Sequence, residues 1–218
     1  MDDKTIFPPE YFARQDDTED EFFYSIPRKV VHIDGPAIKT LTGLYADLIP
    51  PDSAVLDLMS SWRSHLPESE SLPLRRVAAL GMNYDEMIDN PRLIDQDIWV
   101  QNLNQNPNLP FAPLEFDVVL CAVSVQYLVH PLDVFAEVYR ILKPGGRFIL
   151  SFSNRCFPSK ATAIWLASTD IQRVQLVSLY FKESGAWGDA KARIKNADSG
   201  APVSEDPLYM IWADKPEN

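Results

Sequence analysis

The chain has 218 residues, of which 46% are hydrophobic and 23% charged, so it is long enough to bury a core and one main domain is expected. Its formal net charge of −11 argues against nucleic acid as a partner, because proteins that bind a phosphate backbone gather lysine and arginine. Two cysteines, no basic leader and no apolar run of membrane length favour a soluble cytoplasmic protein without a membrane partner; the oligomeric state stays open.

The N-terminal part differs in composition from the rest of the chain. Residues 16–21 are acidic and residues 22–24 are aromatic. We expect residues 1–35 to form an extension that packs on a domain running from 36 to 218. That domain begins with a predicted helix, because Asp34 suits an N-cap, Pro36 suits a first turn, and apolar residues repeat at helical spacing until Pro50.

Short apolar runs between turn signals predict four buried strands, over residues 54–58, 76–80, 98–101 and 116–123. A helix over about 132–142, ended by residues 143–146, precedes a fifth strand over 147–152. Two further helices, over about 160–167 and 171–184, precede closing strands over 190–196 and 208–213. The fold class predicted is α/β, a doubly wound, mostly parallel, seven-stranded Rossmann-like sheet whose last strand is antiparallel.

In a sheet of this kind a ligand binds beyond the carboxyl ends of the strands. The residues expected there carry hydroxyls, amides and sulfur atoms but few charges. Such groups suit a nucleoside held by hydrogen bonds better than a hydrolytic centre. No dinucleotide fingerprint of the form GxGxxG follows any predicted strand, which makes hydride transfer less favoured.

Three motifs in the second half carry a family resemblance: Leu109-Pro110-Phe111, then Phe116-Asp117-Val118-Val119, then Glu137-Val138-Tyr139-Arg140-Ile141-Leu142-Lys143-Pro144-Gly145-Gly146. Their order and spacing closely resemble those of class I S-adenosylmethionine-dependent methyltransferases that act on small molecules. The resemblance covers about residues 36 to 215. It implies S-adenosyl-L-methionine as cofactor and a small-molecule acceptor.

The chain departs from the family pattern at three places. The family follows its first strand with a glycine-rich loop, where this chain has Met59-Ser60-Ser61-Trp62-Arg63. The acidic residue that grips the ribose after the second strand is replaced by Gly81, and the aspartate after the third by Asn102. Either hydroxyls and amides have rebuilt the site, or the fold has become a non-catalytic binding or regulatory module.

The strand ends and the resemblance together define candidate site residues. Tyr127, Gln126 and Arg155 are the candidates for catalysis: the first two for orienting a nucleophile, and Arg155 for clamping a substrate carboxylate or offsetting nearby acids. The predicted cofactor-binding residues are Asp57, Leu58, Met59, Ser60, Ser61, Gly81, Met82, Asn83, Asn102, Leu103, Asn104 and Val123. No cluster of metal ligands is predicted. Methyl transfer to a small acceptor is therefore the expected activity.

Overall fold

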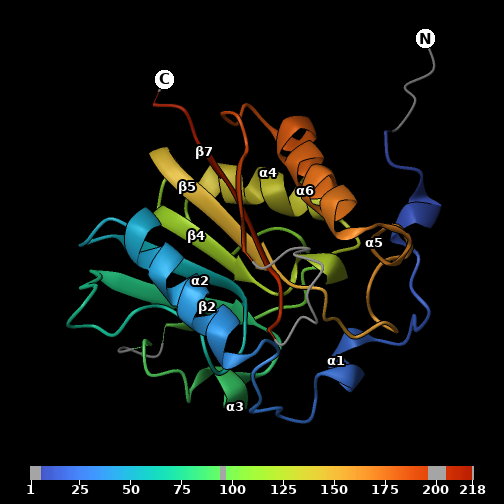
Figure 1. Cartoon of the computed structure of the whole chain (residues 1–218), viewed down its shortest axis with the longest axis horizontal. Coiled ribbons are helices and arrows are strands. Elements are labelled where there is room, and N and C mark those ends of the chain that lie inside the picture. The colour runs from blue at the N-terminus through green and yellow to red at the C-terminus, as the bar shows by residue number, and fades with distance from the viewer. Residues whose placement is uncertain (1–5, 94–96, 196–204, 218) are drawn as a thin grey trace.

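The structure is a computed structural model that describes residues 6–93, 97–195 and 205–217. Its centre is a seven-stranded sheet with the strand order β3-β2-β1-β4-β5-β7-β6 (Figure 1). The first five strands pair in parallel, and β7 pairs antiparallel with both β5 and β6. The predicted fold class is confirmed. The strands are β1 Ala54–Ser60, β2 Arg76–Gly81, β3 Ile98–Val100, β4 Phe116–Ala122, β5 Leu142–Phe152, β6 Lys191–Lys195 and β7 Leu208–Asp214.

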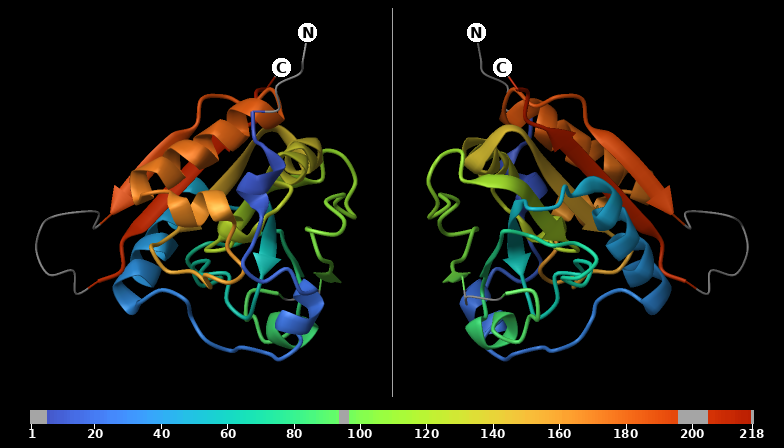
Figure 2. Two further views of the ribbon diagram at one scale, coloured as in Figure 1. Left: turned by 90° about the vertical axis from the view of Figure 1, so that its right-hand side faces the viewer. Right: turned by 90° about the vertical axis from the view of Figure 1, so that its left-hand side faces the viewer.

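Helices cover both faces of the sheet (Figures 1 and 2). On one face α2 (Gly35–Leu48) buries Leu41 and Tyr45 against apolar residues of the sheet. On the other, α4 (Pro131–Ile141) and α6 (Asp170–Ser184) pack together over a cluster rich in aromatic rings, with the short α5 (Ala163–Ala167) beside them. The two apolar clusters flank one sheet, as a doubly wound fold requires.

The predicted N-cap of the first long helix is present, and the structure adds a capping signal that was not predicted. The Asp34 carboxylate accepts a hydrogen bond from the backbone N–H of Ala37 and so caps α2. Thr169 and Gln172 form a capping box at the start of α6. Helix α5 begins three residues later than the predicted helix over 160–167. The predicted strand over 190–196 is seen as β6, and its last residue lies outside the described residues.

β5 begins earlier than predicted. Residues 143–146 were expected to form the turn after α4, yet the strand already starts at Leu142, which pairs with Phe116. The register then shifts, and Gly145 adopts a φ of 76° while its N–H donates to the carbonyl of Lys215. Glycine reaches this φ without strain, so the chain kinks inside the sheet instead of leaving it.

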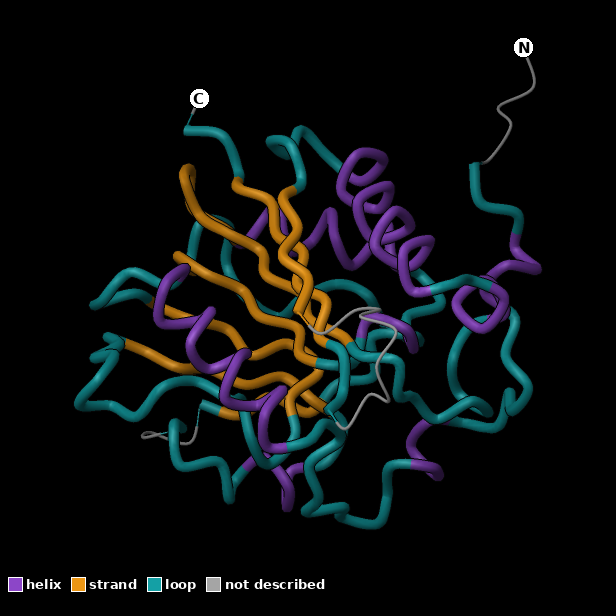
Figure 3. The backbone as a smooth tube through the Cα atoms, viewed as in Figure 1, coloured by secondary structure: helices purple, strands orange, loops and turns teal. Residues whose placement is uncertain are grey.

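The connections on the β1 side of the sheet contain little helix. Residues 61–75, between β1 and β2, form no helix, and α3 (Tyr84–Met87) between β2 and β3 has a single turn. Figure 3 shows the connections between these strands mostly as loop. Consequently the loop that follows β1 supplies no helix N-terminus, which would otherwise attract a negatively charged ligand group.

The N-terminal segment, residues 6–34, includes the single-turn elements η1 (Pro9–Phe12) and α1 (Asp20–Phe23). Its main anchor is Lys160, which has no exposed side-chain surface and donates to the carbonyl of Thr18 at 2.7 Å. The Lys160 ammonium also lies 3.4 Å from the buried carboxylate of Asp20, which Arg14 approaches at 2.6 Å. The predicted boundary near residue 35 stays a prediction.

No helix in the described ranges is long and apolar enough to cross a membrane.

We predict that Lys160→Met destabilises the fold and loosens the N-terminal segment. Removing one partner of a buried charge cluster costs about 3 kcal/mol, because the remaining carboxylate keeps its desolvation penalty. Urea unfolding measures the loss, and tryptic cleavage at Arg14 and Arg28 should become faster. Lys182→Met, on an exposed part of α6, is the control and should change stability by less than about 0.5 kcal/mol. Equal stability of the two variants would contradict the anchor.

Candidate functional site

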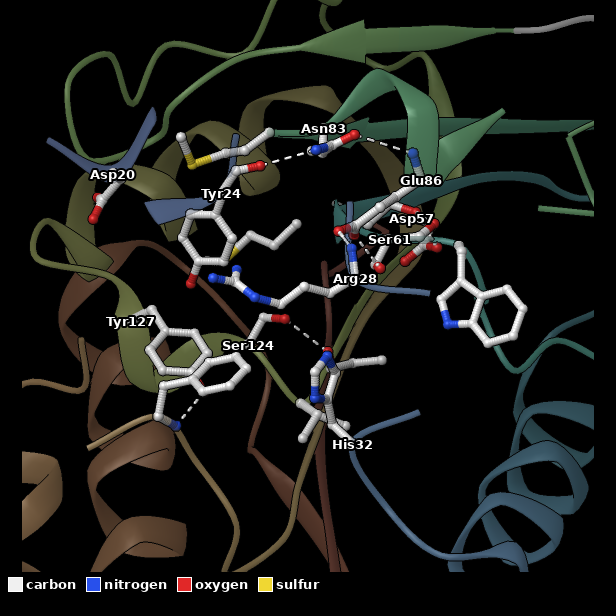
Figure 4. Close-up of a pocket in the computed structure, with 18 of the residues that line it drawn as sticks. Asp20, Tyr24, Arg28, His32, Asp57, Ser61, Asn83, Glu86, Ser124 and Tyr127 are labelled. Carbon is white, nitrogen blue, oxygen red and sulfur yellow. Dashed lines mark hydrogen bonds between the residues drawn. The ribbon is translucent and has the colours of Figure 1, made fainter. Parts of the chain in front are cut away.

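A pocket of about 310 Å³ lies beyond the carboxyl ends of β1, β2 and β4 (Figure 4). Its walls come from the loops after these strands and after β3, from α3, from the N-terminal segment and from the loop after β5. Of the predicted site residues, these line it: Asp57, Met59, Ser60, Ser61, Gly81, Met82, Asn83, Asn102, Leu103, Asn104, Val123, Tyr127 and Arg155. The strand-end rule therefore located the pocket.

The loop after β1 turns without a glycine. Met59 has a φ of 57°, in the left-handed region that side chains rarely adopt, and the pairing of β1 with β2 shifts register between Leu58 and Ser60. This bulge pushes the carbonyl of Ser60 against the second strand. A Cβ placed on Gly81 would lie 2.2 Å from that carbonyl oxygen and 2.9 Å from the sulfur of Met87. Glycine at position 81 is thus a requirement of backbone packing.

A carboxylate nevertheless lies in this part of the pocket, and it comes from Glu86 in α3. The Glu86 side chain accepts from the Ser61 hydroxyl and from the backbone N–H of Arg28, each at 2.5 Å. Glu86 is 8% exposed and lines the cavity. The pocket therefore contains a carboxylate five residues after Gly81 in the chain.

Three predicted asparagines bond to the N-terminal segment in this structure. Asn83 donates to the carbonyl of Tyr24, and Asn102 donates to the carboxylate of Glu21, each at 2.9 Å. Asn104 donates to Asp20 and also accepts from the N–H of Val129. Their amides hold the segment on the pocket rim. Their predicted contact with a cofactor stays a prediction.

Two predicted site residues lie outside the pocket lining. Leu58 has no exposed surface and packs in the core between strands. Gln126 is 1% exposed, and its amide donates to the carbonyl of Val123 at 2.8 Å. Val123 has a φ of 53°, which is strained for a β-branched residue, so the Gln126 amide supports the turn after β4. Sequence spacing did not distinguish these inward-facing side chains from their neighbours.

Tyr127 and Arg155 line the pocket but have partners already. The Tyr127 oxygen accepts from the N–H of Phe157 at 2.9 Å, and burial raises the pKa of Tyr127 to about 12. Its hydroxyl stays protonated near neutral pH, and its role in orienting a nucleophile stays a prediction. Arg155 pairs with Asp206 at 2.7 Å, which favours the predicted alternative that it offsets a nearby acid.

Asp57 is the buried carboxyl of the site. It is 2% exposed at the end of β1, and its carboxylate accepts from the Ser60 hydroxyl at 2.7 Å. Burial raises its pKa to about 7, with the Ser60 hydrogen bond acting in the opposite direction. The side chain faces the same loop that carries the left-handed Met59, so it holds the turn after β1.

Several residues of the pocket were not predicted, chiefly Arg28, His32 and Glu86. His32 and Arg28 come from the N-terminal segment, whose sequence has no motif. Burial lowers the pKa of His32, with the Arg28 charge adding to the effect and Glu86 opposing it. The imidazole is therefore neutral near pH 7. The acidic pair Asp85-Glu86 was the one available signal, because α3 follows a strand end.

Comparison with known proteins agrees with this geometry. Residues 78–150 match the family model described as a methyltransferase domain. The malonyl-[acyl-carrier protein] O-methyltransferase of Marinomonas sp. is 26% identical over 110 residues, which are 50% of this chain and 38% of that protein. The biotin biosynthesis bifunctional protein BioHC of Teredinibacter turnerae is 38% identical over 66 residues, 30% of this chain and 11% of that protein. The chain thus spans less than half the length of these curated relatives.

Solved structures share the fold at low sequence identity. Phosphoethanolamine N-methyltransferase 2 of Haemonchus contortus, in complex with S-adenosyl-L-methionine, has a TM-score of 0.60 at 12% identity, over 90% of this chain and 56% of that one. The [4+2]-cyclase SpnF has a TM-score of 0.58 at 13% identity, over 82% of each chain. The predicted resemblance to the class I S-adenosylmethionine-dependent methyltransferases is confirmed, and the chain has their fold.

We predict that Gly81→Ala destabilises the protein by about 2 kcal/mol, because the new Cβ meets a backbone carbonyl that cannot move aside cheaply. Gly43→Ala is the matched control. A Cβ there has no neighbour within 4 Å, and alanine favours the α2 helix in which it lies. Urea unfolding of both variants checks this, and equal stability would contradict the close approach of β1 to β2.

The pKa of Asp57 predicts a pH dependence of stability. Because its pKa is raised from 3.8 to about 7, the folded state retains a proton that the unfolded state releases between these values. Its contribution to the free energy of unfolding should therefore fall as pH rises from about 4 to about 7, and then level off. Asp57→Asn removes this titration, so its stability relative to the wild type should rise over that range. A constant difference would contradict burial as the cause.

Proposed function

We propose that this protein transfers a methyl group from S-adenosyl-L-methionine to a small-molecule acceptor. The observation that carries the proposal is the position of the pocket. Its floor is formed by the ends of β2 and β4 and the residues that follow them, which lie inside the stretch matching the methyltransferase domain. Relatives named as methyltransferases and methyltransferases of the same fold support it.

The groups in the pocket suit a nucleoside. Leu80, Leu103 and Val123 line the same pocket as Ser61 and Glu86 and add apolar surface to its polar groups. Flat bases pack on apolar surfaces, and ribose hydroxyls donate to carboxylate and hydroxyl oxygens. We therefore assign the ribose to Ser61 and Glu86. Their present hydrogen bonds, to each other and to the Arg28 N–H, show that both oxygens of the Glu86 carboxylate already accept donors at this place.

The chemistry needs alignment more than acid–base catalysis. The cofactor, when bound, supplies a methyl group on an electrophilic sulfonium. The protein must hold the acceptor in line with that group and exclude water. Tyr24, Tyr127 and Phe157 give the pocket an apolar wall for this purpose.

An acceptor that must lose a proton needs a base, and His32 is suited to that role. Its lowered pKa leaves the imidazole neutral near pH 7, so it can accept a proton. It lies in the wall, 5.4 Å between ring centroids from Phe157, on the side formed by the N-terminal segment. Figure 4 shows His32 and Tyr127 on the same side of the cavity.

Isothermal titration calorimetry with S-adenosylmethionine and S-adenosylhomocysteine tests the proposal. We expect the wild type to bind both, and Glu86→Gln to weaken both by about tenfold, since a charge-assisted acceptor for the ribose is lost. Asp85→Asn is the matched control. Asp85 is the neighbouring acid, is exposed and does not line the pocket, so its variant should bind as the wild type does.

Absence of binding by the wild type at about 1 mM of either ligand would overturn the proposal, because a cofactor site needs an affinity well below that concentration. The alternative of a non-catalytic module on the same fold would then be supported. Equal affinity of Glu86→Gln and Asp85→Asn would instead overturn the ribose assignment alone.

A further inference from the structure

We propose that Arg28 binds a carboxylate of a ligand inside the pocket. The inference rests on the proposed function in one respect, since the cofactor is one of the two candidate ligands. Arg28 itself lies in the N-terminal segment. Arg28 was not a predicted site residue. Its backbone N–H is held by Glu86, and Figure 4 shows its side chain extending from there across the cavity toward Tyr24.

The other arginines that line the described part of the pocket are engaged elsewhere. Arg14 pairs with the buried Asp20, and Arg155 pairs with Asp206. Arg63 donates to the carbonyls of Trp62 and Asp89. The guanidinium of Arg28 has no carboxylate within ion-pair distance among residues 6–93, 97–195 and 205–217.

Aromatic rings position the Arg28 guanidinium instead. Its central carbon lies 4.4 Å from the ring centroid of Phe23, 5.8 Å from that of Phe157 and 5.9 Å from that of Tyr24. Ring faces stabilise the cation without using its N–H donors, which lie in the guanidinium plane. A planar fork of donors held in this way matches a carboxylate, which accepts two parallel hydrogen bonds.

Of the arginines that line the described part of the pocket, Arg28 and Arg63 have no carboxylate partner, and the Arg63 guanidinium already donates to two backbone carbonyls, so Arg28 is the cation best placed to attract an anion. No helix begins at the end of β1, so no helix N-terminus supplies N–H groups there. His32 is neutral near pH 7 because burial lowers its pKa, and burial lowers the pKa of His65 to about 4. The net charge of −11 repels an anionic ligand from most of the protein surface. A basic side chain that is not paired with a carboxylate offsets this repulsion locally.

Two sources of the carboxylate are compatible with this chemistry. One is the amino-acid part of the cofactor, and the other is an acid group on the methyl acceptor. The rings around Arg28 would pack against the apolar part of either ligand. The position of Arg28 between Glu86 and the aromatic wall places it within the pocket in both cases.

Calorimetry of Arg28→Gln and the wild type separates the sources. The probes are S-adenosylhomocysteine, 5′-methylthioadenosine, which lacks the amino-acid carboxylate, and the pair benzoate and benzamide. The variant should bind a carboxylate probe at least about tenfold more weakly and its neutral counterpart unchanged. A loss for S-adenosylhomocysteine but not for 5′-methylthioadenosine assigns the cofactor carboxylate. A loss for benzoate but not for benzamide assigns the acceptor.

Two variants serve as controls. Lys29→Gln removes the neighbouring positive charge, which pairs with Asp89 outside the pocket lining, and should bind all four probes as the wild type does. Arg28→Lys keeps the charge but loses the planar fork, so its affinity for the carboxylate probe should lie between those of the wild type and Arg28→Gln. Thermal unfolding of each variant shows that the fold is retained.

The proposal is overturned if Arg28→Gln and the wild type bind, or fail to bind, all four probes alike. It is also overturned if the variant loses charged and neutral probes equally, because that result indicates a structural role. Failure of the proposed function has a different signature, since the wild type would then bind neither S-adenosylhomocysteine nor 5′-methylthioadenosine. Benzoate binding that depends on Arg28 would support the inference even then.

Discussion

The contact between the carbonyl of Ser60 and the backbone of Gly81 determines the shape of the site. The bulge at Met59 brings the first strand so close to the second that no side chain fits at position 81. Two departures from the family pattern, a first loop without glycine and a second strand without its acid, are therefore one structural change. Where the family places glycines in the loop, this chain has a glycine on the strand opposite the loop, and Glu86 of α3 is the residue proposed to supply the acidic group.

The N-terminal segment completes the site that this contact opens. The connections after β1 and β2 contain little helix, and residues 20–32 form part of the pocket wall beyond these strands, held by side-chain amides of the pocket rim and by Lys160. Arg28 and His32 enter the pocket from this segment, so much of its charge is supplied by residues distant in sequence from the strands. The same amides that were candidates for cofactor contact thus contribute to the pocket wall.

Much of the fold could be predicted because a strand buried on both faces is a continuous run of apolar residues in the sequence. Asp34 marked the start of a helix, and the two closing strands were also recognisable from the local sequence. The strand ends located the pocket for the same reason. The rest depends on contacts between distant residues. Glu86 reaches Arg28 across 58 positions and Ser61 across 25, and no spacing rule records such pairs. Leu58 and Gln126 were misplaced because alternation near a bulge or a left-handed residue does not tell which side chain faces the cavity.

The anchoring of the N-terminal segment also bears on the kinetics of ligand exchange. Since the segment forms one wall of the pocket and is fastened at Asp20 and Lys160, a ligand whose entry requires this wall to move would first have to release that anchor. Association is then governed by the small population of molecules whose segment is open, and apparent affinity is reduced by that fraction. A bound ligand that contacts the segment would in turn stabilise its closed position, and its own dissociation would be slower for that reason.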